Sequence, residues 1–303
     1  MLAYAFPGQG SQYPGMGKSL LEAYPEVEDV LRRADGILGR PISRLLFDAT
    51  EEELRRTRNT HPAIFLYSAA LYEAVRSVRP PDVVLGHSLG EFAALYAAGV
   101  LDFRSALNLV VERGRIIEEN TRREGSMVAL IGENVLRFAE EVLNAIRSKT
   151  LVIANYNSPR QVVISGYKVE VDRALEMLHR KARRLGAHLR AIRLRISFAS
   201  HSPAVEEASE RFASLLDGVK FGRPRVPVIL GTTGKATMDE EEIRAALRVQ
   251  LHSSVRFVDM IDEALRIGVR EVWEVGPGKV LSSLIRQITD RVRVRPLDPS
   301  NQR

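Results

Sequence analysis

The segment from residue 81 to residue 100 constrains the fold more than any other part of the chain. Its sequence, PDVVLGHSLGEFAALYAAGV, joins an apolar run of strand type to a helix pattern rich in small residues through GHSLG at 86–90. A serine with glycine two residues away on each side is typical of a nucleophile elbow, because a Cβ at either glycine would collide across the bend. The bend raises the Ser88 hydroxyl above the sheet and points the first N–H groups of the helix at any oxyanion formed there. A chance G-x-S-x-G is the alternative, and the strand before it and the helix after it favour the nucleophile.

The composition is that of a globular protein. With 303 residues, 45% of them hydrophobic, the chain can bury a full core in one large domain or two smaller ones. No apolar run approaches the roughly 20 residues of a membrane helix, and Met1 leads into a strand pattern without a charged leader, so we expect a cytoplasmic protein with no membrane partner. The chain has no cysteine, which excludes disulfides and thiol nucleophiles. The net charge of +6 comes from dispersed basic residues without interleaved aromatics, so we expect no nucleic-acid partner.

Alternating strand and helix patterns predict an α/β fold with a mainly parallel sheet covered by helices. We expect its strands at 2–6, 83–85, 226–230, 271–275 and 292–296. We expect its helices at 17–24, 26–38, 62–78, 92–98, 102–121, 240–250 and 255–267, with a last one from the GPG turn at 276–278 to residue 288.

From Ser126 the pattern changes to strand, helix, strand, strand, helix, strand. The turn NSPR at 157–160 joins the middle two strands as a hairpin. This βαββαβ order is that of a ferredoxin-like unit. We therefore predict an inserted subdomain at 124–195, with the α/β-hydrolase-like catalytic subdomain formed by 1–123 and 196–303. Within the insert we expect strands at 127–131, 151–156, 161–165 and 189–195, and helices at 134–147 and 169–185.

A serine nucleophile needs a general base, and the chain offers six histidines. His201 stands where the chain leaves the inserted unit and re-enters the larger one, and loops at such junctions line clefts. We therefore predict that His201 is the base, with a loop residue that caps a helix as the alternative. Of the other histidines, His61 precedes Pro62 at a predicted helix start and is a second candidate to face the cleft. Strand alternation turns the His87 side chain away from the cleft, and the remaining three fit solvated or capping positions: His179, His188 and His252.

Five motifs in a fixed order carry a family resemblance over essentially the whole chain. They are FPGQGSQ at 6–12, GHSLGE at 86–91, ERG at 112–114, NSP at 157–159 followed by QVVISG at 161–166, and EVGPG at 274–278. In these motifs the chain resembles the malonyl-CoA:acyl carrier protein transacylases and the related acyltransferase domains of polyketide synthases. The resemblance implies an α/β-hydrolase-like large subdomain with an inserted ferredoxin-like small one, which agrees with the element order above.

The resemblance also implies ping-pong transfer of a malonyl group from malonyl-CoA to the phosphopantetheine thiol of acyl carrier protein, in fatty acid or polyketide synthesis. Ser88 would attack the thioester carbonyl and His201 would accept its proton. The backbone N–H groups of Gln9 and Leu89 would hold the oxyanion.

Two sources can orient His201. The resemblance implies a main-chain carbonyl rather than a carboxylate, and the matching position is Gln250. Glu206 and Glu207 lie close to His201 in sequence and are the alternatives, although a glutamate at a helix start more often serves only as a partner of the helix dipole.

Arg113 lies on the helix after the elbow, on a face that would normally carry an aliphatic residue. A guanidinium that reaches a buried pocket can bind a carboxylate through two parallel hydrogen bonds, which suits a malonyl group. It disfavours acetyl and fatty acyl donors, since these would leave the arginine buried and unpaired. The alternative is a surface arginine balanced by acidic neighbours such as Glu112 or Glu118.

Selectivity within the dicarboxylic donors stays open. Leu89 resembles malonyl-selective members, whereas FASH at 198–201 is closer to the YASH segment of methylmalonyl-selective domains. Ser200 is smaller than the phenylalanine of many malonyl enzymes, and an extra methyl group changes selectivity by only about 1 to 3 kcal/mol. We favour malonyl.

His61 stands where many relatives carry glutamine and could bind the acyl carboxylate. The remaining predicted substrate contacts are Gln9, Asn157 and Phe198.

Two other protein classes share part of this pattern. A serine esterase or thioesterase has the elbow, but its histidine lies close to the C-terminus, whereas about a hundred residues follow His201. A carrier-docking protein without catalysis would normally have lost Ser88 or His201.

No cluster of His, Asp and Glu has ligand spacing, so we expect no metal and no bound cofactor. We expect a monomer whose partner is an acidic acyl carrier protein.

Overall fold

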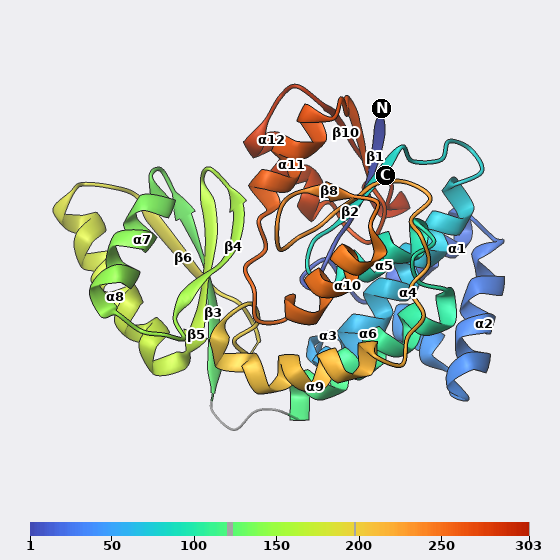
Figure 1. Ribbon diagram of the computed structural model, residues 1–303, viewed down its shortest axis with the longest axis horizontal. Helices are drawn as coiled ribbons and strands as arrows, with labels where there is room; N and C mark the ends of the chain where they lie inside the picture. The colour runs from blue at the N-terminus through green and yellow to red at the C-terminus, as the bar shows by residue number, and fades with distance from the viewer. Residues whose placement is uncertain (120–123, 197, 303) are drawn as a thin grey trace.

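The computed structural model describes residues 1–119, 124–196 and 198–302, which form a larger and a smaller body (Figure 1). The larger body is built on a six-stranded sheet in the order β10-β9-β1-β2-β7-β8. All neighbouring strands are parallel except β7 and β8, which pair antiparallel at one edge. The predicted α/β class with a mainly parallel sheet is therefore confirmed. The strands are β1 (Leu2–Phe6), β2 (Val83–Gly86), β7 (Val228–Ile229), β8 (Ala236–Thr237), β9 (Glu271–Glu274) and β10 (Arg293–Pro296).

Both faces of this sheet are buried. Tyr4 and Phe6 of β1 belong to one hydrophobic cluster, and Ala3 and Ala5 belong to a second one, because successive side chains of a strand point to opposite faces. The surrounding helices are α1 (Met16–Ala23), α2 (Val27–Leu38), η1 (Ile42–Leu46), α3 (Glu51–Arg55), α4 (Thr57–Val75), α5 (Gly90–Ala97), α6 (Phe103–Glu119), η2 (Pro203–Val205), α9 (Glu206–Leu216), α10 (Glu240–Val249), α11 (Phe257–Arg266), α12 (Val280–Ile288) and η3 (Pro299–Gln302). Among the described residues, no helix combines the length and apolar character that would let it cross a bilayer.

The element bounds depart from the sequence prediction in a few places. Helix α4 begins at Thr57, five residues before the predicted start, so that Pro62 lies inside the helix. Of the predicted strand at 226–230, only the two residues of β7 form a strand in the structure. Residues 120 and 121, the predicted end of α6, lie outside the described residues. Helix α3 was missed although its capping box, formed by Thr50 and Glu53, is visible in the sequence.

The smaller body is a four-stranded antiparallel sheet in the order β4-β5-β3-β6. Its elements follow the order βαββαβ, so the predicted ferredoxin-like unit is confirmed. The boundaries at 124 and 195 stay a prediction. The elements are β3 (Gly125–Gly132), α7 (Val135–Ile146), β4 (Val152–Ser158), β5 (Gln161–Tyr167), α8 (Lys168–Arg184) and β6 (Leu189–Arg193).

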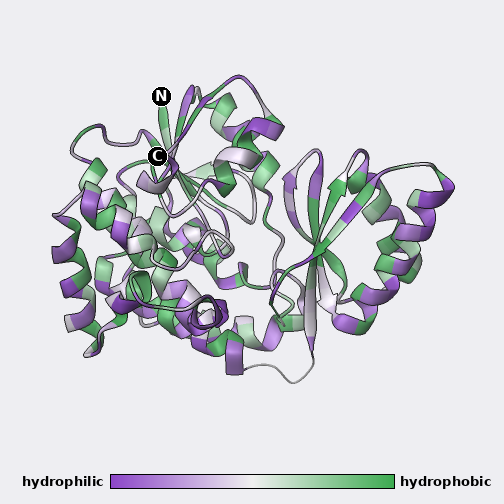
Figure 2. Ribbon diagram, turned by 180° about the vertical axis from the view of Figure 1, so that it is seen from behind, coloured by the Kyte–Doolittle hydropathy of each residue, from purple (hydrophilic) through white to green (hydrophobic). Residues whose placement is uncertain are grey.

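The two faces of the smaller sheet have different partners. Helices α7 and α8 cover one face, and hydrophobic and hydrophilic residues alternate along α8 (Figure 2). The other face carries a small apolar cluster that includes Met127 and Ala154. At the edge of this sheet the backbone of β4 pairs with Val255 of the larger body, through Val255 N to Ala154 O at 2.8 Å and Tyr156 N to Val255 O at 2.9 Å. The two bodies are therefore joined by main-chain hydrogen bonds as well as by the chain itself.

Candidate active site

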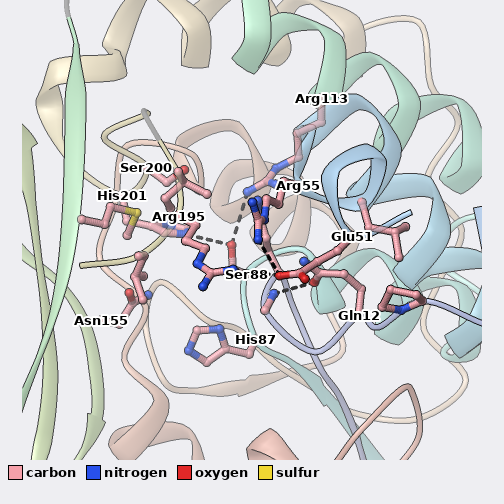
Figure 3. Close-up of a pocket in the computed structure, with 17 residues that line it drawn as sticks. Gln12, Glu51, Arg55, His87, Ser88, Arg113, Asn155, Arg195, Ser200 and His201 are labelled. Atoms are coloured by element: carbon pink, nitrogen blue, oxygen red, sulfur yellow. Dashed lines mark hydrogen bonds and ion pairs between the residues drawn. The ribbon is translucent and has the colours of Figure 1, made fainter. Parts of the chain in front are cut away.

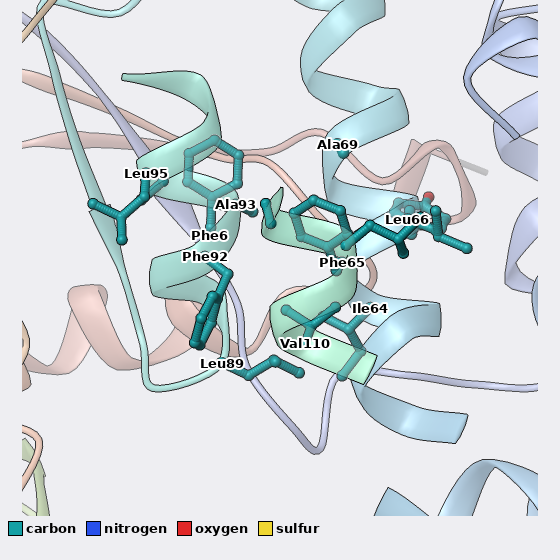
Figure 4. Packing of buried hydrophobic residues seen from close by; sticks show 14 of the residues in the cluster. Phe6, Ile64, Phe65, Leu66, Ala69, Leu89, Phe92, Ala93, Leu95 and Val110 are labelled. Carbon is teal, nitrogen blue, oxygen red and sulfur yellow. The ribbon is translucent and has the colours of Figure 1, made fainter. Parts of the chain in front are cut away.

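Ser88 occupies the tip of the turn between β2 and α5, with a φ of 52° that is uncommon for a residue with a side chain. A Cβ added to Gly86 would overlap the backbone of Gly90, and one added to Gly90 would overlap the carbonyl of Phe6. Both positions therefore require glycine, as the elbow pattern predicted. Buried hydrophobic residues beneath the turn fix α5 against α4 and α6 (Figure 4). They include Phe6, Ile64, Phe65, Leu89, Phe92, Ala93 and Val110.

His201 lies beside the nucleophile. Its Nε2 is 2.7 Å from Ser88 Oγ, and its Nδ1 is 3.0 Å from the carbonyl oxygen of Gln250 and 2.9 Å from that of Ser253. Because a carbonyl oxygen can only accept, Nδ1 carries the proton and Nε2 is left as the acceptor for the serine hydroxyl. Burial, together with the nearby Arg113 guanidinium, lowers the pKa of His201 to about 3, so the imidazole is neutral at pH 7.

Arg113 reaches the same point from α6. Its guanidinium is buried, with only 2% of the residue exposed, and burial lowers its pKa to about 10, so it stays charged at neutral pH. Nη2 donates to Ser88 Oγ and to Gln250 Oε1, both at 3.3 Å, and Nη1 donates to His61 Nε2 at 3.2 Å. The buried cation therefore faces the nucleophile (Figure 3), and its hydrogen-bond partners among the described residues are neutral groups.

These groups open into a cavity of about 290 Å³ between the two bodies. The larger body supplies Ser88, His201 and Arg113, and the smaller body supplies Met127 and Asn155 on the opposite wall. Within the part of the chain that the structure describes, no group of three or more His, Asp and Glu side chains could hold a metal ion. The rest of the lining comes from Gln9, Gly10, Gln12, Pro14, Glu51, Leu54, Arg55, His87, Leu194, Arg195, Ile196 and Ser200.

The other predicted site residues lie at different distances from this cavity. Gln9 and Ser200 line it, and Leu89 is the N-cap residue of α5, where backbone N–H groups lack partners within the helix. His61 is buried beside Arg113. Phe198 is buried in the larger core and is not among the lining residues.

Asn157 and His87 form a contact that the sequence did not reveal. Asn157 Oδ1 accepts from His87 Nε2 at 2.9 Å, and its Nδ2 donates to Gln161 Oε1 at 3.0 Å. His87, which strand alternation turned away from the cleft in our prediction, lies on the cavity wall. Asn155, which also lines the cavity, was missed, although it lies two residues before Asn157 on the same strand and alternate residues share a face.

Comparisons with known proteins cover nearly the whole chain. A family model described as the acyl transferase domain matches residues 3–296. The malonyl CoA-acyl carrier protein transacylase of Bacillus subtilis is 37% identical over 295 residues, which cover 96% of this chain and 92% of that protein. The crystal structure of an acyl carrier protein S-malonyltransferase from Vibrio cholerae superposes with a TM-score of 0.90 at 35% identity, over 98% of this chain and 96% of that one. A type II polyketide synthase malonyl-transacylase, solved in complex with its acyl-carrier protein, gives the same TM-score, identity and coverage.

Proposed function

Since this chain belongs to the acyl transferase family that includes the malonyl-CoA:acyl carrier protein transacylases, we propose that Ser88 carries a malonyl group from malonyl-CoA to the phosphopantetheine thiol of an acyl carrier protein. One observation carries the roles of the residues: Ser88 Oγ lies within hydrogen-bonding distance of both His201 Nε2 and Arg113 Nη2. The base and the cation that would bind the acyl carboxylate therefore both lie next to the nucleophile.

The first half-reaction acylates the enzyme. Ser88 Oγ attacks the thioester carbonyl carbon while its proton passes to His201 Nε2. The oxyanion of the tetrahedral intermediate is held by the backbone N–H groups of Gln9 and Leu89. The intermediate collapses when the carbon–sulfur bond breaks, and the CoA thiolate leaves with the proton from His201. The product is a malonyl ester on Ser88.

The second half-reaction is the reverse with a different thiol. The phosphopantetheine thiol of the carrier protein gives its proton to His201 and attacks the ester carbonyl, and Ser88 leaves with that proton. The carbonyl oxygens of Gln250 and Ser253 hold the imidazole in one tautomer through both steps. No carboxylate is needed for this orientation, so Glu206 and Glu207, which begin α9, have no part in the proposed mechanism.

Arg113 selects the donor. When a malonyl group enters, its free carboxylate replaces the weak contact between Arg113 Nη2 and Ser88 Oγ with a charge-assisted pair in a buried site. An acetyl group offers no such partner and leaves the cation uncompensated. Ser200 lines the cavity, so methylmalonyl-CoA is the second donor to be compared in every assay.

Intact-mass spectrometry tests the proposal. After incubation with malonyl-CoA, the protein is expected to carry one malonyl group on Ser88, and this group should move to holo acyl carrier protein when the carrier is added. Free CoA without a lasting adduct would point to an esterase or thioesterase, and no reaction would point to a carrier-docking protein. Acylation elsewhere, shown by an adduct that survives in Ser88→Ala, would contradict the assigned nucleophile.

We further propose that the protein acts as a cytoplasmic monomer on an acidic carrier protein. The net charge of +6 supports electrostatic attraction to such a partner. Transfer rates should then fall as ionic strength rises, because salt screens charges on exposed surfaces. Light scattering coupled to gel filtration measures the oligomeric state directly, and a dimer mass would contradict this part.

A further inference from the structure

Glu91 is a buried carboxylate that the mechanism above does not use. It lies in the first turn of α5, three residues after the nucleophile, and only 1% of the residue is exposed. Its Oε2 accepts a hydrogen bond from Gln250 Nε2 at 2.7 Å. A carboxylate buried to this degree is costly unless it is paired, so its position beside the reacting groups calls for a reason.

The Gln250 side chain connects Glu91 to the reacting groups. Its Nε2 donates to the Ser88 carbonyl at 3.0 Å as well as to Glu91, and its Oε1 accepts from Arg113 Nη2 at 3.3 Å. The same residue accepts from His201 Nδ1 through its main-chain oxygen. One glutamine therefore touches the nucleophile, the base and the cation.

The carboxylate of Glu91 sets the polarity of this amide. A carboxylate and a carbonyl can only accept, so the two hydrogens of the Gln250 NH2 group must face Glu91 and Ser88. The amide oxygen is then left facing Arg113. With the amide reversed, the NH2 group would point at the guanidinium, and an oxygen would point at the carboxylate.

Glu91 also supplies charge. In the part of the chain that the structure describes, Arg113 donates hydrogen bonds to His61, Ser88 and Gln250, all neutral groups. The charge of Glu91 acts on Arg113 across one amide and favours its charged form. A carboxylate in direct contact would occupy the guanidinium and compete with the acyl carboxylate. A carboxylate held one side chain away stabilises the cation and leaves it available.

We propose that Glu91 is a positioning residue for dicarboxylic acyl donors, which fixes the Gln250 amide so that its oxygen holds Arg113 in the cavity. The inference rests on the proposed function, because it concerns the donor that Arg113 binds. Burial raises the pKa of Glu91 to about 7, so the assays are done at pH 8, where the carboxylate is mostly charged.

The test is Glu91→Gln, an isosteric change, made in the wild-type protein and in Arg113→Ala. Stopped-flow measurement of Ser88 acylation gives kcat/KM for malonyl-CoA and for acetyl-CoA. We expect kcat/KM for malonyl-CoA to fall at least tenfold, mostly through KM, while the value for acetyl-CoA falls less than threefold. In Arg113→Ala the same change should alter malonyl loading less than twofold, because the group through which Glu91 acts is gone.

Glu274→Gln is the matched control. Glu274 is a second fully buried carboxylate, and its oxygens accept from the backbone N–H groups of Leu281 and Ser282 at 2.9 and 2.7 Å, at the start of α12. This variant should lower the melting temperature without changing the ratio of malonyl to acetyl loading. If Glu91→Gln does not fold, Gln250→Met breaks the same link at similar side-chain length and should lower malonyl loading more than acetyl loading.

Three results would overturn the inference. They are equal losses for malonyl-CoA and acetyl-CoA, an undiminished loss in the Arg113→Ala background, and no loss in Glu91→Gln. Each of them leaves the proposed function intact as long as the wild-type protein still forms the malonyl adduct and passes it to the carrier. Absence of that wild-type adduct would instead remove the proposed function itself.

Discussion

The two bodies of the molecule contribute to the cavity in different ways. In the larger body, Ser88, Arg113, His201 and Gln250 come from four segments and are linked by hydrogen bonds: His201 and Arg113 each contact Ser88 Oγ, and Gln250 contacts His201 through its main chain and Arg113 through its side chain. The smaller body contributes the facing wall, where Met127 is one of the lining residues. The difference teaches that the body built on the mainly parallel sheet supplies the reacting groups from its turns, loops and helices, while the antiparallel body shapes the space in front of them.

The wall is nevertheless held in a defined place. Besides the backbone pairing at Val255, Ser254 Oγ donates to Ile153 O at 2.7 Å, and Ser158 Oγ donates to Gln287 Oε1 at 2.8 Å. These bonds tie both ends of β4 to the larger body. Variants of the reacting groups in the larger body should therefore change the acylation reaction itself. Variants in the smaller body should change only how well the acyl donor fits the cavity.

The largest effect is expected for Ser88→Ala. Loss of the nucleophile should lower acylation by malonyl-CoA by at least about 10³-fold, while the melting temperature stays close to that of the wild type. Quenched-flow trapping of labelled protein measures the rate. Acylation of Ser88→Ala at an undiminished rate would mean that the nucleophile lies outside the elbow. It would contradict the assignment of the chemistry to this part of the larger body.

Arg113→Ala should cause the next largest loss. Removing a buried charge that pairs with the acyl carboxylate costs about 3 kcal/mol, or roughly a hundredfold in kcat/KM for malonyl-CoA. The loss for acetyl-CoA should be smaller, since acetyl makes no ion pair. Competition between the two donors in one mixture gives the ratio, and a ratio equal to that of the wild type would contradict the carboxylate-binding role.

His201 should also make stability depend on pH. Its pKa is about 3 in the folded protein against an ordinary value of 6.5, so the unfolded chain takes up the proton first as the pH falls. Between pH 7 and pH 5 this lowers the free energy of unfolding by about 2 kcal/mol. Glu91, whose pKa is raised, acts in the opposite direction. Its contribution cancels when the wild type is compared with a variant that lacks only His201.

Urea unfolding of the wild type and of His201→Gln at both pH values measures this contribution. The variant should lose about 2 kcal/mol less than the wild type over this interval. His179→Gln, on the exposed face of α8 in the smaller body, is the matched control. Identical pH dependence in the wild type and His201→Gln would mean that the imidazole takes up its proton over the same pH range in the folded and unfolded states, and would contradict the lowered pKa.

His61→Leu should have a moderate effect. Its Nε2 accepts from Arg113 Nη1, so leucine leaves one buried donor unpaired and should reduce malonyl loading about tenfold. His61→Gln keeps an acceptor and should recover most of this loss. Equal values for the two variants would indicate that packing, and not the hydrogen bond, accounts for the role of His61.

The smallest effect is expected at Asn157 of the smaller body, which does not line the cavity itself but contacts His87, which does. Asn157→Ala removes the hydrogen bond to His87 Nε2, which is worth about 1 kcal/mol, and should lower kcat/KM for malonyl-CoA about fivefold through KM. Gln161→Ala removes only the second partner of Asn157 and should change the value less. A loss at Asn157 as large as that at Arg113 would show that the smaller body takes part in the chemistry.

Local features of the site could be predicted from the sequence, and features that depend on distant segments could not. The elbow at Ser88 is visible because its two glycines and flanking elements lie within twenty residues. The match at Gln250 gave the main-chain carbonyl but no hint of its side chain, which reaches two other segments, the elbow with Ser88 and Glu91 and helix α6 with Arg113, only after folding. Asn157 was expected to touch substrate, whereas the structure pairs it with His87.

The same distinction holds for the fold. The βαββαβ unit was predicted because each element has a clear period of its own. Strand β8 was missed because its two residues, Ala236 and Thr237, are defined only by their pairing with β7. Helix α9 was missed as a complete element because the sequence drew attention only to its first two glutamates.

The backbone at the two reacting side chains restricts what evolution or design can place there. Ser88 and His201 both have left-handed backbone angles, with φ of 52° and 62°. Threonine has a hydroxyl of comparable reactivity, but its branched Cβ strongly disfavours this conformation. A threonine-dependent version of the enzyme would therefore require a different loop, and not merely a different side chain.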